Sequence, residues 1–205
     1  ISWNPNTAPE TISSVTFTPN NEAPISLDEK IQQKFTSSNR YAAIFSLVNP
    51  PAEASGTIKI VFSGNVSAGI VVGAANFTGV DPTTPLDAAK GASGKSVNFD
   101  SLDGDELVFD TLFLGGNPPA SVTPDEGRDP LWDQYVGNTR GAASIKQATS
   151  SSLTMSWTST GTTAAIAAIP INPAPCTNTC YTLTLGVESG NGSLPTAVPV
   201  KSAAC

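Results

Sequence analysis

Short segments with strand character, separated by turn residues, fill most of this chain and constrain its fold more than any other feature. The candidate strands cover residues 13–18, 41–48, 56–63, 68–78, 95–99, 106–114, 142–147, 152–159 and 163–171. Short strands with Gly and Pro between them are typical of all-β proteins. We therefore predict an all-β fold, namely a two-sheet antiparallel β-sandwich of jelly-roll or Ig-like type, followed by a C-terminal β-hairpin tail.

Two kinds of strand pattern indicate where individual segments lie in the sandwich. Residues 166–169 and 70–75 are nearly continuous runs of apolar and small residues, which predicts central strands covered on both faces. Residues 152–158 alternate instead, which predicts a strand with one buried and one wet face. We expect Leu153, Met155 and Trp157 to point into the core, and Thr154, Ser156 and Thr158 to point away from it.

The segment 26–35 is open to two interpretations. Ser26 is a candidate helix cap, Asp28 and Glu29 would lie in the first turn, and apolar residues follow at intervals of four. A short helix or helical turn crossing one end of the sandwich fits this pattern, and an extended segment fits it equally.

Residues 115–141 lack strand periodicity and predict a long loop, the kind of segment that often binds ligands. Asp125, Glu126, Asp129 and Asp133 concentrate carboxylates there, so calcium is a candidate ligand, with a solvated acidic loop as the alternative. Trp132 and Tyr135 either stack on a sugar ring or anchor the loop to the sandwich, and we favour anchoring. Another acidic run, residues 103–106, contains Asp-Gly and predicts a turn.

Charge and composition exclude several classes of function. The chain has 10 Lys and Arg against 17 Asp and Glu, a net charge of −7, so nucleic acid is not an expected partner. It contains no apolar run long enough for a membrane span and no signal peptide pattern. His is absent, which removes the commonest general base and zinc ligand. We therefore expect no catalytic residues and no cofactor other than calcium, and only carboxylate chemistry survives among enzyme mechanisms.

The C-terminal part differs from the rest in its prolines and cysteines. We expect a β-sandwich domain at 1–171, a Pro-rich linker at 172–179 and a hairpin tail at 180–205. All three cysteines follow residue 175, and a disulfide between Cys180 and Cys205 would stabilise the tail by about 3 kcal/mol. Cys176 is then a free thiol or pairs outside this stretch, and three reduced thiols are the alternative. An oxidised tail predicts an extracellular or cell-surface location.

Three triplets satisfy the N-glycosylation sequon. They begin at Asn65, Asn76 and Asn191. These positions are candidates for a glycoprotein if the source glycosylates its secreted proteins.

Several motifs, taken in order, resemble landmarks of a known family. Residues 47–58, 75–86, 105–111, 154–157 and 164–174 are similar to segments of a modular β-sandwich domain of large secreted bacterial and archaeal surface proteins, which are adhesin-like. The resemblance covers about residues 1–174, and the tail is similar to the opening hairpin of a second extracellular repeat module. It implies a non-catalytic role in adhesins, stalks or surface layers. Such domains carry an additional N-terminal strand before the segment that matches Ile1, so a sheet edge or groove would be open here.

Two functions from different classes follow from these features. The first is an extracellular structural subunit, a filament protomer or surface-adhesin module that self-associates head to tail by adding a donor strand to its neighbour. The donor would be residues 181–200 or 1–12. The alternative to donation is that the missing strand lies upstream in a precursor and the tail begins the next module. The second function is a carbohydrate-binding module with a glycan as partner, and an enzyme ranks third.

Overall fold

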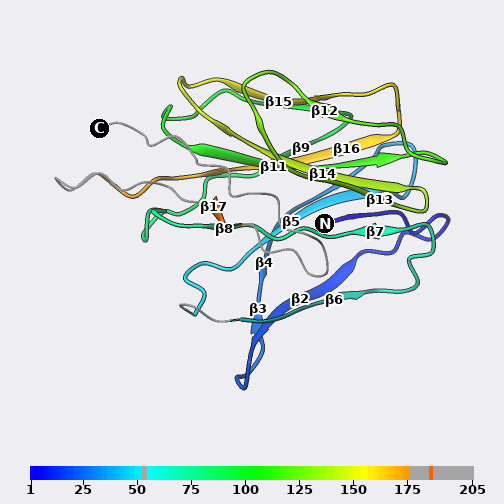
Figure 1. Ribbon diagram of the computed structural model, residues 1–205, viewed down its shortest axis with the longest axis horizontal. Helices are drawn as coiled ribbons and strands as arrows, with labels where there is room; N and C mark the ends of the chain where they lie inside the picture. Colours follow the sequence, from blue (N-terminus) through cyan, green and yellow to red (C-terminus); the bar gives the residue numbers. More distant parts are fainter. Residues whose placement is uncertain (52–54, 176–184, 187–205) are drawn as a thin grey trace.

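The computed structural model describes residues 1–51, 55–175 and 185–186, and every regular element in them is a β-strand. The bounds of the strands, labelled in Figure 1, are β1 Ser2–Trp3, β2 Ile12–Pro19, β3 Ile25–Ser26, β4 Asp28–Lys34, β5 Tyr41–Ser46, β6 Gly56–Phe62, β7 Ile70–Val71, β8 Asn76–Phe77, β9 Lys90–Ser93, β10 Ser96–Phe99, β11 Leu107–Gly115, β12 Thr123–Pro124, β13 Asp129–Val136, β14 Thr139–Gln147, β15 Leu153–Thr158, β16 Ala164–Ile171 and β17 Leu185–Gly186. The described residues contain no helix that could span a membrane.

A five-stranded antiparallel sheet in the order β13-β14-β11-β16-β9 forms the centre of the molecule. All eight residues of β16 are buried, because β16 pairs with β11 and β9 and both of its faces are covered. On one face of β16 the packed residues are Ala164, Ile166 and Ala168. On the other face they are Ala165, Ala167 and Ile169. The prediction that residues 166–169 form a central strand is confirmed.

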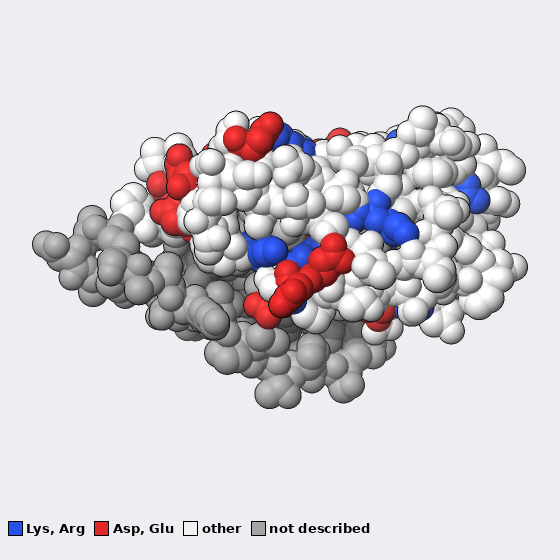
Figure 2. Space-filling view, turned by 90° about the horizontal axis from the view of Figure 1, so that it is seen from above, with Lys and Arg blue, Asp and Glu red and all other residues white. Residues whose placement is uncertain are grey.

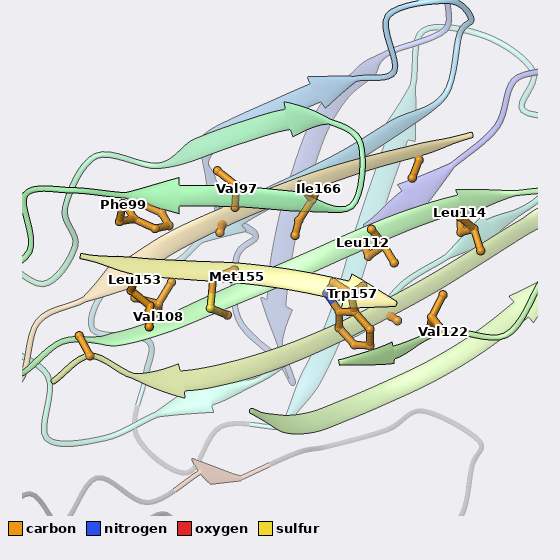
Figure 3. Close-up of a cluster of buried hydrophobic side chains, with 14 of the residues drawn as sticks. Val97, Phe99, Val108, Leu112, Leu114, Val122, Leu153, Met155, Trp157 and Ile166 are labelled. Carbon is orange, nitrogen blue, oxygen red and sulfur yellow. The ribbon is translucent and has the colours of Figure 1, made fainter. Parts of the chain in front are cut away.

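The sheet β10-β15-β12 covers one face of the central sheet, and Figure 3 shows the apolar side chains between them. Leu153, Met155 and Trp157 of β15 point into this core with 9%, 0% and 4% of their surface exposed. The alternate residues Thr154 and Thr158 are exposed, and Ser156 is partly exposed. The predicted register of this strand is therefore confirmed.

Two further sheets lie on the other side of the central sheet (Figure 1). The sheet β4-β5-β1-β7 packs directly on it, with Ile44 of β5 in one core cluster with Phe113 of β11. The sheet β3-β2-β6 follows, and Trp3 of β1 and Tyr41 of β5 lie in its core cluster, with ring centroids 4.8 Å apart. The fold is thus an all-β sandwich of antiparallel sheets, as predicted.

The helical interpretation of residues 26–35 is wrong, because β3 and β4 occupy this segment. Ile31 and Phe35 both pack against the same core cluster. A spacing of four residues places side chains on one face of a strand as well as on one face of a helix, so the apolar pattern did not distinguish the two.

The predicted long loop at 115–141 is wrong in its second half. β13 and β14 form a hairpin there, joined at Gly137, whose φ of 55° suits a tight turn. β13 is an edge strand with mostly exposed residues and a bulge after Pro130. An exposed edge strand needs no apolar alternation, so its sequence reads as a loop.

The prediction that residues 70–75 lie in the middle of a sheet is also wrong. Only β7 and β8 within 68–78 are strands, and β7 is the edge of its sheet. Val72 is 47% exposed. This interrupted segment borders a hollow between the sheets.

The acidic turn at 103–106 is confirmed, although Glu106 is not a solvated residue. Its carboxylate accepts hydrogen bonds from the backbone N–H groups of Asp103, Gly104 and Asp105, at 2.5, 2.8 and 3.1 Å. Burial acts to raise the pKa of Glu106, but these hydrogen bonds outweigh it and hold the pKa below its usual value. Glu106 therefore closes the turn that leads into β11.

Most of the predicted tail at 180–205, including Cys180, Cys205 and Asn191, lies outside the described residues, as does Cys176. The start of the predicted linker packs on the body, since Pro173 forms a bridge with Val80. Beyond it, β17 pairs antiparallel with β8, placing Leu185 opposite Phe77.

Candidate functional site: an apolar slot in line with the first strand

One hollow of about 750 Å³ lies between the sheets on the β5 side of the molecule. We call it the slot, and four groups of residues line it. Residues 44–48 form one wall and residues 72–77 form the other. Phe109, Ile169 and Ile171 of the central sheet line its floor, and residues from β2 and β6 line its roof.

The first wall is a strand edge that is only partly paired within the described part of the chain. β1 pairs with only the first part of β5, with Ser2 opposite Ala42 and Trp3 opposite Tyr41. Ile1 adds the last contact, because its backbone exchanges two hydrogen bonds with Ala43, at 2.8 and 3.0 Å. Beyond Ala43 no described strand pairs with this edge of β5. Backbone groups on an open edge are free to pair with an added strand.

The second wall begins at β7, on the other side of β1. Ser2 pairs with Val71 and Trp3 with Ile70, so β1 lies between β5 and β7 (Figure 1). Ile1, just before β1, lines the slot. Residues 72–77 continue this wall as far as β8. A strand lying in the slot would therefore continue the line of β1, between the two walls.

Gly73 gives the second wall its close fit to the body. A Cβ atom at this position would overlap the indole carbons of Trp132 in β13. The Trp132 ring also packs against Phe109, with centroids 6.0 Å apart. Trp132 therefore anchors the wall, as favoured from the sequence, although it does so from a strand.

Replacing Gly73 by Ala is expected to destabilise the protein by about 1–3 kcal/mol, because the methyl group overpacks the site against Trp132. Urea unfolding measures the effect. In a Trp132→Ala background, Gly73→Ala should lower the free energy of unfolding much less, because the clashing ring is gone. Equal costs in both backgrounds would contradict this contact.

The α-amino group of Ile1 is at the inner end of the slot. Its nitrogen donates a hydrogen bond to the carbonyl oxygen of Ala43. Burial lowers the pKa of this amino group to about 5. Among the described residues that line the slot, Asp81 has the only titratable side chain. Hydrogen bonds from the backbone N–H groups of Thr83 and Thr84 lower the pKa of Asp81 and hold it in a local turn. The described lining of the slot is thus mostly apolar.

Raising the pH from 5 to 8 is expected to increase the free energy of unfolding of the chain with a free Ile1 amine. Over this range the unfolded chain binds more protons, because its amine titrates near 8.0 and the folded one near 5. The gain is about 2–4 kcal/mol. Chemical denaturation at several pH values measures it, with the Nα-acetylated chain as the control. Identical pH profiles for the two chains would contradict a buried amine.

The four carboxylates predicted as calcium ligands do not come together. Asp125 accepts hydrogen bonds from Ser156 and from Thr158, the latter at 3.0 Å, and these bonds lower its pKa. Asp133 pairs with Arg140 at 2.5 Å. Glu126 and Asp129 belong to no such group either, since no three potential ligands cluster among the described residues. The acidic pattern therefore reflects separate local contacts.

The remaining predicted surface residues are dispersed. Asn65 is exposed, and Asn76 is exposed on β8, at the slot. Tyr135 is 59% exposed, with Arg140 lying 5.2 Å over its ring. Charged side chains on the face seen in Figure 2 form small separate groups, without a large basic patch.

A buried ionic cluster, which sequence analysis missed, lies inside the core instead. Asp110 of β11 pairs with Arg128 and accepts hydrogen bonds from Ser144 and from Trp157 Nε1, the latter at 2.8 Å. Burial raises the pKa of Asp110, and Arg128 and the hydrogen bonds oppose this shift. The Arg128 guanidinium also lies 4.9 Å over the Trp157 ring. With both charged side chains fully buried, this cluster joins the sheets and has no access to a substrate.

Comparisons of the chain with protein-family models, with curated proteins and with solved structures found no match.

Proposed function

We propose that the protein is an extracellular structural subunit, a filament protomer or surface-adhesin module, whose copies join by β-strand addition. The observation that carries this proposal is the slot, which is apolar, in line with β1 and bordered by the open edge of β5. Strand addition uses such features directly, because main-chain hydrogen bonds supply affinity and alternate side chains fill apolar pockets.

The surface near the slot supports the same proposal. Ile58 of β6 and Val72 line the slot and are 43% and 47% exposed, and Val48 is 40% exposed. Exposed apolar side chains gathered around one hollow are typical of interaction sites. A head-to-tail contact between a slot and a donor on another copy is heterologous, so it propagates into filaments or closed rings.

The alternative functions have weaker support. A sugar platform needs an exposed flat ring, and Trp132 packs against Gly73 and Phe109 instead. Of the two rings predicted to stack, Tyr135 remains exposed. For an enzyme, the described residues offer no open group of acid and base side chains, since the charged pair Asp110 and Arg128 is sealed in the core.

Electron microscopy and sedimentation of the purified full chain, at a series of concentrations, test the proposal. Subunits that assemble by strand addition form filaments or rings whose mass grows with concentration. A species that remains monomeric throughout, and that binds a glycan in an array until Tyr135→Ala removes the binding, would replace the proposal with the carbohydrate-binding alternative.

A further inference from the structure

The strand directions and the residue pairing around the slot indicate what it binds. β1 is antiparallel to both β5 and β7, so an added strand that continues β1 is antiparallel to both walls. The C-terminal strand β17 is also antiparallel to the second wall, where Leu185 pairs with Phe77 and Gly186 with Asn76. β17 therefore already has the direction that the slot requires.

We propose that residues 181–187 of a neighbouring copy fill this slot as the added strand, an inference that rests on the assembly function proposed above. The observed register places Leu185 opposite Phe77 and Gly186 opposite Asn76, and both residues of β8 line the slot. This assignment specifies both the donor segment and the acceptor wall of the contact.

The chemistry of the donor segment matches the slot. Tyr181, Leu183, Leu185 and Val187 alternate with Thr182, Thr184 and Gly186, and none of these residues is charged. The apolar row suits a floor made of Phe109, Ile169 and Ile171, and the alternate row is small enough to pass between floor and roof. A charged donor would be excluded, because an unpaired charge buried in an apolar slot is costly.

The length of the chain permits exchange between copies. The body ends beside Gly79, whose carbonyl oxygen accepts a hydrogen bond from the backbone N–H of Ala174 at 2.8 Å. The ten residue-to-residue steps from Pro175 to Leu185 span up to about 33 Å when extended. The tail can thus reach its own β8 or the identical wall of an adjacent copy. If the segment is exchanged between copies, the pairing of β17 with β8 then links two copies and builds a polymer.

Photocrosslinking from the slot tests the assignment. Phe77 is replaced by the photoreactive p-benzoylphenylalanine, and these chains are mixed in denaturant with equal amounts of ¹⁵N-labelled wild-type chains and refolded. After irradiation, mass spectrometry identifies the crosslinked peptides. We expect adducts on residues 181–187, carrying the heavy label in the proportion in which the chains were mixed.

One control, one substitute position and three outcomes make this test decisive. The same photoreactive residue at Tyr135, which is exposed and does not line the slot, should give no tail adducts. If the Phe77 variant does not fold, the exposed slot residue Val72 takes its place. Unlabelled tail adducts alone would show that the tail fills its own slot and would overturn the exchange. Filaments that form without tail adducts would overturn the donor and leave the assembly function standing. Absence of any polymer would overturn that function.

Discussion

Replacing Trp157 by Ala is expected to lower the free energy of unfolding by about 3–5 kcal/mol, the range found for large aromatic side chains removed from cores. Trp157 is 4% exposed and packs between β15 and the central sheet (Figure 3). The change also removes the Nε1 hydrogen bond to Asp110 and the ring beneath Arg128, which places the effect near the upper end. Urea unfolding monitored by circular dichroism measures the loss.

Tyr135→Ala is the matched control, because Tyr135 is an aromatic residue with 59% exposure. Its removal should change stability by less than about 0.5–1 kcal/mol. A Trp157→Ala variant as stable as the Tyr135→Ala variant would show that β15 does not present its apolar face to the core.

Replacing Arg128 by Met is expected to cost a similar amount, about 3–5 kcal/mol, because it leaves the buried Asp110 carboxylate without its counter-charge. The double variant Arg128→Met with Asp110→Asn should regain part of this loss. Asn cannot ionise, and its side-chain oxygen still accepts hydrogen bonds from the Ser144 N–H or from Trp157 Nε1. Denaturant unfolding at neutral pH compares the two. A single variant within about 1 kcal/mol of wild type would show that the pair is not buried as described.

Strand patterns that depend on burial could be predicted from the sequence. The alternation in β15 and the continuous apolar run in β16 are direct consequences of one covered face and two covered faces. The pattern failed where burial does not control the sequence. The exposed edge strand β13 has no alternation of apolar and polar residues. Around β4, apolar residues spaced four apart fit a helix and a strand equally.

The candidate site was predictable only in outline. The resemblance to surface-protein domains implied an open edge near Ile1, but the walls of the slot come from segments far apart in sequence, such as β5 and residues 72–77. No local motif encodes such a juxtaposition. The nearest local signal is Gly73, whose lack of a side chain lets the wall close on Trp132. The ionic cluster was missed for the same reason, since Asp110 and Arg128 meet only through sheet pairing.

Two substitutions on β6 offer the most direct test of strand addition into the slot. Ile58 lines the slot and Val61 does not, although both lie on β6 and are 43% and 38% exposed. An aspartate at either position faces water in the monomer, so both variants should fold. Only at position 58 would it be buried against an incoming apolar strand.

The decisive measurement is the sedimentation profile of Ile58→Asp beside Val61→Asp and the wild type, at one concentration and with circular dichroism as a check of folding. Strand addition predicts that Ile58→Asp shifts the mass from polymers to monomers, and that Val61→Asp assembles as the wild type does. Equal assembly of both folded variants would contradict a role for the slot.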